Sequence, residues 1–360
     1  MKNKTAYLFS ADIVRVMAII CVVIIHTFNA VQARIDFLGG TSWWIANFLG
    51  SVSRVSIPLF IMLSGFLIMG KNESFAKTLQ RTYRRLIIPL LAWTVFYLLW
   101  NAGSPSFKGL ATFFPRLFSG GAFHLYFLFI LAGLYCFAPF LRSFLTVEQK
   151  VKKILLFFFL SIGFLFTLGQ YFFNKCGDTN AFTLWIPYLG YFFGGYVLGN
   201  IKTSNSLKKL SFLAFTGGFA ITAIFSFIHL YLRRENLGSL QPESCISPYF
   251  DNYLSFNVVL MSFAVFFLLF HFNFGFAGNL TIKKIVHSLS RASFGIYSIH
   301  IFVIEVIERT LNLRIETLQI GLLSYLFLKW FFVFGISYFL TLLGMQTPFL
   351  KKAFGVWEKK

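Results

Sequence analysis

Hydrophobic residues in this chain are gathered into ten runs, each close to the roughly 20 residues that a helix needs to cross a bilayer. Short polar segments that carry most of the Lys and Arg residues separate them. The pattern predicts an all-α integral membrane protein, in which residues 1–360 form a single domain, one bundle of about ten transmembrane helices. The predicted helices are 9–31, 43–70, 86–103, 122–140, 154–173, 183–200, 211–232, 252–275, 294–310 and 319–343.

Two of these runs contain residues that shape a helix. The second run is long, and Pro58 predicts that it tilts or breaks there. The sixth run contains Gly190, Gly194, Gly195 and Gly199, whose spacing is typical of closely packed membrane helices. We favour packing over a binding role for these glycines.

The basic residues between the runs predict the topology. Most of the 32 Lys and Arg residues lie at the two termini and in the loops after the second, fourth, sixth and eighth runs. Basic loops remain on the cytoplasmic side of a membrane. We therefore expect both termini in the cytoplasm and a first helix that runs outward.

Composition narrows the class of protein. Hydrophobic residues make up 57% of the chain and charged residues 12%, which excludes an ordinary soluble domain. The net charge of +20 would fit nucleic-acid binding, but the cations lie in short loops between apolar runs. We expect membrane lipids and no nucleic acid as partners. The first run is too long and too polar for a cleavable signal peptide.

Four polar residues mark the first predicted helix as a candidate functional element. Arg15 and His26 are eleven residues apart, so they share a face and lie about 16 Å apart along the axis. Asp12 and Asn29 extend the same face. Ionisable groups within a membrane are usually functional. The alternative is that Arg15 reaches the cytoplasmic interface and His26 is a packing histidine.

Cations in and after the second run form the next candidate site. Arg54 lies among serines, which suits a polar cavity or an anchor at the interface. Lys77, Arg81, Arg84 and Arg85 precede the third run. They fit either a phosphate-binding cluster or ordinary positive-inside topology.

Asn29 and three polar residues later in the chain could form an acceptor or oxyanion site. His124 begins the fourth run, and Tyr297 and His300 share a face of the ninth. Each is also compatible with a packing role inside a bundle.

Other ionisable residues suggest contacts more than chemistry. A membrane-embedded Lys329 would pair with Glu305 or Glu308. Cys176 and Cys245 fall in predicted outer loops, where a disulfide or two free thiols are compatible with the sequence. No Cys/His spacing indicates a metal site, and no metal is expected.

Five segments, in order, resemble the bacterial membrane acyltransferase-3 family. DIVRVMAIICVVIIH resembles its Arg-(ten residues)-His signature, SIPLFIMLSGFLI its second-helix element and TYRRLIIPL its basic stretch before a proline. FHLYFLFILAGLYCFAPFLR resembles its fourth element, with Tyr126 in place of the usual Trp, and LSRASFGIYSIH its late element. The nearest branch resembles the surface-polysaccharide O-acetyltransferases, which include the enzyme acting on enterobacterial common antigen.

The resemblance implies an activity. Family members transfer an acyl group, usually acetyl, from cytoplasmic acyl-CoA to a hydroxyl of a glycan or lipid-linked sugar, in the bacterial inner membrane. It implies that Arg15 and His26 are essential and that Arg84 and Arg85 belong to the basic stretch. Acetyl-CoA would be the donor substrate, with no permanently bound cofactor. A homo-oligomer is compatible with the sequence.

A mechanism can be predicted by joining both arguments. His26 would act as general base on the acceptor hydroxyl, and Arg15, oriented by Asp12, would hold the thioester arm or a phosphate. Arg54 is grouped with the acyl-CoA-binding cations, although it or Tyr297 could also stabilise the oxyanion. An acyl-histidine intermediate stays open. The alternative function is a proton-coupled transporter or exporter of a glycan or small molecule, although no inverted repeat is visible.

Overall fold

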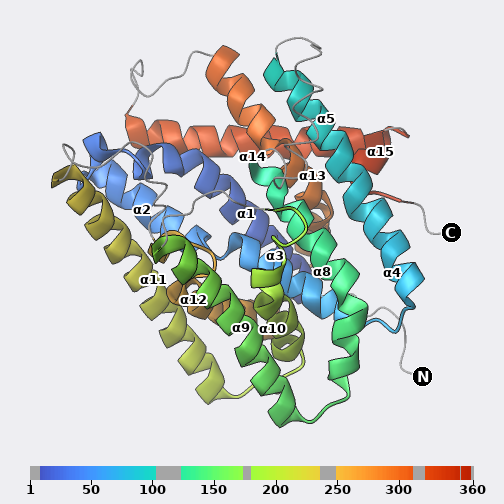
Figure 1. The fold of residues 1–360 in the computed structure, drawn as a ribbon. Coiled ribbons are helices and arrows are strands. Elements are labelled where there is room, and N and C mark those ends of the chain that lie inside the picture. Colours follow the sequence, from blue (N-terminus) through green and yellow to red (C-terminus); the bar gives the residue numbers. More distant parts are fainter. Residues whose placement is uncertain are drawn as a thin grey trace.

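The computed structural model describes residues 9–102, 123–172, 180–235, 249–310, 321–348 and 350–357. Every regular element in these ranges is a helix, and eight spans are long and apolar enough to cross a membrane. The predicted all-α membrane fold is therefore confirmed (Figure 1). These spans are Phe9–Gln32, Thr41–Met69, Tyr126–Leu145, Gln149–Phe172, Asn205–Arg234, Tyr249–His271, Leu280–Arg309 and Leu322–Gln346.

The first helix lies at the centre of the bundle. Helix α1 (Phe9–Gln32) packs against α2 (Thr41–Ser53), α3 (Ser56–Met69) and α13 (Leu280–Thr310). Most of its apolar residues are buried, because neighbouring helices cover it on several sides (Figure 1). The polar residues of α1 are therefore held within the protein, where their contacts are well defined.

The second predicted run forms two helices. The break lies at Arg54 and Val55, between the end of α2 and the start of α3, a few residues before Pro58. That proline occupies the first turn of α3, where a missing backbone N–H disturbs no intrahelical hydrogen bond. The break brings Arg54 to a helix junction inside the bundle.

Helical structure begins earlier than two of the hydrophobic runs. Helix α5 (Ile88–Ala102) is preceded without interruption by α4 (Phe75–Thr82) and a π-helical turn, Tyr83–Ile87. In Figure 1, α4 and α5 lie in line along one edge of the bundle. Helix α13 starts at Leu280, well before the predicted residue 294. Its additional turns are polar and reach the beginning of α1.

The remaining helices complete the bundle. The fourth predicted run begins with a 3-10 turn, Phe123–Leu125. The third and sixth runs correspond to α5 and α10, which are shorter than the eight long spans. The other helices are α8 (Tyr126–Arg142), α9 (Gln149–Phe172), α10 (Leu189–Gly199), α11 (Asn205–Glu235), α12 (Phe256–His271), α14 (Leu322–Gln346) and α15 (Leu350–Ala353).

Glycines allow α3 and α10 to touch through their backbones. A Cβ added to Gly65 would lie 1.8 Å from the carbonyl oxygen of Phe192, and one added to Gly195 would lie 1.9 Å from that of Met62. Neither distance is sterically possible, so both positions require a residue without a side chain. The contacts support the packing interpretation of the glycines in the sixth run.

The structure shows which of two predicted partners Lys329 binds. Lys329 of α14 pairs with Glu308 of α13, whereas Glu305 accepts hydrogen bonds from Trp100 and Arg309. The pairing satisfies a buried ammonium group and joins two helices. Cys176 and Cys245 lie outside the described residues.

Candidate active site

A small pocket lies beside α1. Its walls come from α1, α3, the start of α8, the turn before α12, and α13. Five of its eight lining residues are His or Tyr, which is an unusual concentration of polar groups for the interior of a membrane bundle. The lining residues are Val22, Ile25, His26, Ile57, His124, Tyr126, Tyr253 and Tyr297.

His26 differs from its neighbours on α1. It lines the pocket, and its side chain is exposed, while Ile25 and Thr27 on either side are buried. Within the described part of the chain, its ring makes no hydrogen bond. An imidazole with free nitrogens at a pocket wall can accept a proton from a bound molecule.

Two further histidines stand next to His26. The rings of His26 and His300 have centroids 5.0 Å apart, and those of His300 and His124 are 5.2 Å apart. His124 and His300 are both buried. The structure therefore brings together three histidines that lie on three different helical segments.

Backbone carbonyls indicate the tautomers of the two buried rings. His300 Nδ1 lies 2.7 Å from the carbonyl oxygen of Tyr297, so the neutral ring carries its proton there. Nε2 of His124 lies 3.4 Å from the carbonyl oxygen of Ser298 and is the donor in that ring. The opposite nitrogens, Nε2 of His300 and Nδ1 of His124, are buried without a partner among the described residues. Each is an unfilled acceptor close to the pocket.

The hydroxyl of Tyr297 is used in a hydrogen bond between two walls of the pocket. It donates to the backbone carbonyl of His124, which joins α13 to the turn before α8. A hydroxyl used in this way is not free to donate to an oxyanion. The proposed oxyanion role for Tyr297 would require this bond to break.

A second polar cluster surrounds Asp12 near the start of α1. Its carboxylate accepts from Arg15 at 3.1 Å, from Ser290 at 2.5 Å and from the ring of His287 at 2.9 Å. Arg15 Nη1 also donates to Ser290 at 3.3 Å. The predicted pairing of Asp12 with Arg15 is present. Ser290 and His287 were not predicted, because they lie in polar turns of α13 that resemble a loop in the sequence.

Arg54 forms a buried ion pair instead of joining the other basic residues. Its guanidinium lies 3.2 Å from Asp251, with the two side chains 15% and 5% exposed. The fourteen residues of α3 separate it from α4, a length of about 21 Å at helical rise. Arg54 is therefore placed at the far end of α3 from the basic cluster with which the sequence grouped it.

The ion pair connects two walls of the pocket. Arg54 lies three residues before Ile57, and Asp251 lies two residues before Tyr253; both Ile57 and Tyr253 line the pocket. Neither Asp251 nor Tyr253 was a sequence candidate. An acidic residue at the start of an apolar run, opposite an intramembrane arginine, was the signal that could have identified Asp251.

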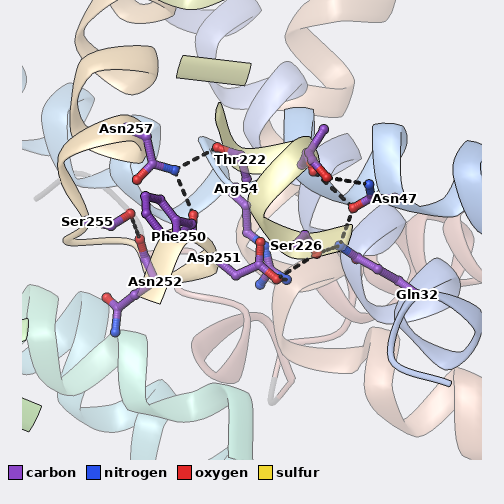
Figure 2. A network of polar contacts seen from close by, with 12 residues as sticks. Gln32, Asn47, Arg54, Thr222, Ser226, Phe250, Asp251, Asn252, Ser255 and Asn257 are labelled. Carbon is purple, nitrogen blue, oxygen red and sulfur yellow. Dashed lines mark hydrogen bonds and ion pairs between the residues drawn. The ribbon is translucent and has the colours of Figure 1, made fainter. Parts of the chain in front are cut away.

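Figure 2 shows that this pair belongs to a larger buried network. Ser226 of α11 donates to Asp251 at 3.4 Å and accepts from Gln32 at the end of α1. Gln32 also donates to Asn47 of α2, and Asn47 donates to the backbone of Ala223 at 2.9 Å. The network fixes α1, α2 and α11 relative to the turn that carries Tyr253.

The basic cluster before α5 is divided by its contacts. Arg81 is paired with Glu73, and Lys77 is exposed on α4. Burial raises the pKa of Glu73, but the hydrogen bond and charge of Arg81 outweigh it, and the pKa lies below its ordinary value. Arg84 and Arg85 lie in the π-helical turn, a feature often found at functional sites.

Asn29, the last polar residue predicted on α1, lies outside the pocket. Asn29 is exposed on α1 beyond His26 and does not line the pocket. In the described ranges, no group of three or more His, Cys, Asp or Glu side chains could hold a metal ion. The pocket therefore presents imidazoles and phenols as its polar groups.

Comparison with known proteins identifies the family. A family model described as an acyltransferase domain, of the acyltransferase-3 type, matches residues 8–346, nearly the whole chain. The chain belongs to the acyltransferase-3 family. No curated protein and no solved structure matches it. This acyltransferase is a multi-pass membrane protein, and its histidine pocket and basic cluster lie within the matched residues.

Proposed function

We propose that this acyltransferase moves an acyl group, acetyl in the simplest case, from acyl-CoA to a hydroxyl of a cell-surface glycan or lipid-linked sugar. His26 would be the general base. The observation that carries the proposal is the exposure of His26 in a pocket where its ring has no hydrogen-bond partner among the described residues. We place the protein in the bacterial inner membrane, with acyl-CoA entering from the cytoplasm.

The chemistry requires removal of one proton and transient stabilisation of one negative charge. A sugar hydroxyl attacks the thioester carbonyl as His26 takes its proton, and the tetrahedral intermediate then expels the CoA thiolate. A positioned histidine contributes roughly 10²–10⁴-fold to such a step. His124 and His300, which carry unfilled acceptor nitrogens, can orient the hydroxyl or the protonated base. Direct transfer needs no covalent enzyme intermediate, and an acyl-histidine would be detected by mass spectrometry.

The donor and acceptor approach from different directions in this scheme. The nucleotide end of acyl-CoA would stay beside α4 and the π-helical turn, while its thioester arm reaches toward α1. Arg15, held by Asp12 and Ser290, would contact the arm on its way to His26. The acceptor would enter the pocket from the side of Asn29.

Transfer of labelled acetyl from acetyl-CoA to a glycan acceptor by the purified protein tests the function. His26→Ala should reduce kcat by about 10²–10⁴-fold without changing the elution profile in detergent. His271→Ala is the matched control, since His271 ends membrane helix α12 and does not line the pocket. Near-normal transfer by His26→Ala would remove the base assignment. Movement of unmodified glycan across the membrane would favour a transporter instead.

A further inference from the structure

The C-terminal segment, residues 350–357, is anchored to the bundle next to the π-helical turn. Phe354 is buried against Gly344, where an added Cβ would lie 2.1 Å from its ring. The indole of Trp93 donates to the carbonyl of Ala353 at 3.0 Å. Gly355 then adopts a left-handed conformation with φ of 69°, which favours glycine. These contacts set the position of the residues that follow.

Trp357 lies between two cations as a result. The guanidinium carbon of Arg84 is 5.6 Å from the centre of the indole, and the ammonium of Lys352 is also 5.6 Å away. Both distances are within the range of cation–π attraction. The indole Nε1 is buried with no hydrogen-bond partner in the described part of the chain. One aromatic ring thus holds together cations from the π-helical turn and from α15.

Among the described residues, no carboxylate balances the positive charge of this cluster. Arg81 is paired with Glu73, but within the described ranges no carboxylate pairs with Arg84, Arg85 or Lys352. Grouped cations without acidic partners repel one another unless an anion is bound. Planar guanidinium groups and a lysine ammonium are the side chains that bind phosphate most often.

We propose that Lys352 and Trp357 complete, with Arg84, a phosphate-binding site that holds the nucleotide end of acyl-CoA. The choice of ligand rests on the proposed function. Trp357 acts by keeping Arg84 and Lys352 close enough to bind the phosphates together. Lys352 and Trp357 lie beyond residues 8–346 that match the family, so this part of the site belongs to the chain's own C-terminal segment.

Comparing two acyl donors isolates the contribution of the nucleotide to binding. Acetyl-CoA carries the phosphates, whereas acetyl-pantetheine has the same thioester and arm without them. Lys352→Ala and Trp357→Ala should each raise KM for acetyl-CoA about tenfold, the loss expected for one charge-assisted contact. They should leave kcat within about twofold and KM for acetyl-pantetheine unchanged. Trp357→Phe, which retains an aromatic ring, should fall between wild type and Trp357→Ala. Lys153→Ala removes an exposed cation from α9 and is the matched control.

Direct binding of CoA in detergent distinguishes this proposal from the function on which it rests. Weaker CoA binding by Lys352→Ala, in a protein that shows no acyl transfer, would support the site and refute only the function. Intact transfer with unchanged CoA affinity would refute the site. An equal rise in KM for both donors would also overturn it, because the segment would then act only on the fold. The alternative ligand is the phosphate of a lipid headgroup. If Lys352→Ala loses binding to phosphatidylglycerol vesicles but retains CoA affinity, the site holds a lipid headgroup and the proposal is wrong.

Discussion

Removing the carboxylate of Asp251 should be among the most damaging single changes in this bundle. Asp251 and Arg54 are 5% and 15% exposed and lie 3.2 Å apart, so Asp251→Ala would leave a guanidinium buried without its counter-ion. Breaking such a pair reduces the free energy of unfolding by about 3–5 kcal/mol. Asp251→Asn keeps an acceptor for Ser226 and Arg54 but loses the charge, and should be less harmful, at about 1–2 kcal/mol.

The double variant Arg54→Met/Asp251→Leu provides the control. Replacing both charges with apolar groups of similar size leaves neither ion unpaired, so its stability should lie within about 1 kcal/mol of wild type. Reversible unfolding in mixed micelles, followed by tryptophan fluorescence, compares wild type, Arg54→Met, Asp251→Leu and the double variant, which together form a double-mutant cycle. If the double variant loses as much stability as Asp251→Ala, the two charges are not coupled and the reasoning fails. Activity is measured separately, because Arg54 also adjoins the pocket.

Three other substitutions test single contacts. Gly65→Ala would place a Cβ 1.8 Å from a backbone carbonyl oxygen of α10, so we expect a loss of about 2 kcal/mol or more in unfolding free energy; wild-type stability would contradict the close approach. Pairing with Arg81 lowers the pKa of Glu73 below its ordinary 4.5. The ionised carboxylate therefore stabilises the fold above that pH, and the stabilisation is lost as the pH falls below it. When the unfolding free energy is measured against pH, Glu73→Gln should lose less stability in acid than wild type. Tyr297→Phe leaves the buried carbonyl of His124 without its donor and should lower unfolding free energy by about 1–3 kcal/mol, with a fall in kcat/KM; unchanged kinetics would limit Tyr297 to packing.

Much of the fold was predictable because lipid imposes a simple rule on sequence. A helix surrounded by hydrocarbon must be apolar for about 20 residues, and the hydrophobic runs therefore located most of the membrane helices. The rule fails where a helix continues among polar partners. The first turns of α13 have the composition of a loop, yet they fold as helix with Ser290 bonded to Asp12. No local pattern reveals that contact, since the two residues lie 278 positions apart.

The candidate site was also only partly predictable from the sequence. His26, His124, Tyr297 and His300 could be selected from the sequence because polar residues in apolar runs are conspicuous, and the structure gathers all four. Their chemical roles stay predictions. The sequence could not place the turn carrying Tyr253, because that turn is positioned by the ion pair and buried network that tie it to other helices. Nor could it separate Arg84 and Arg85 from Arg81, because only the fold shows which cation has a carboxylate partner.

The face of α1 between its two polar sites has a consequence for the cell that contains this protein. Ala18, Ile19 and Val22 lie on that face between Arg15 and His26, and all three are buried. An unbroken column of water through a membrane protein would conduct ions and dissipate the electrochemical gradient across the bilayer. Dry, closely packed side chains present a high barrier to hydrated ions, because an ion would have to shed its water to enter them. The buried side chains on this stretch of α1 therefore oppose the passage of hydrated ions between the Asp12 cluster and the histidine pocket.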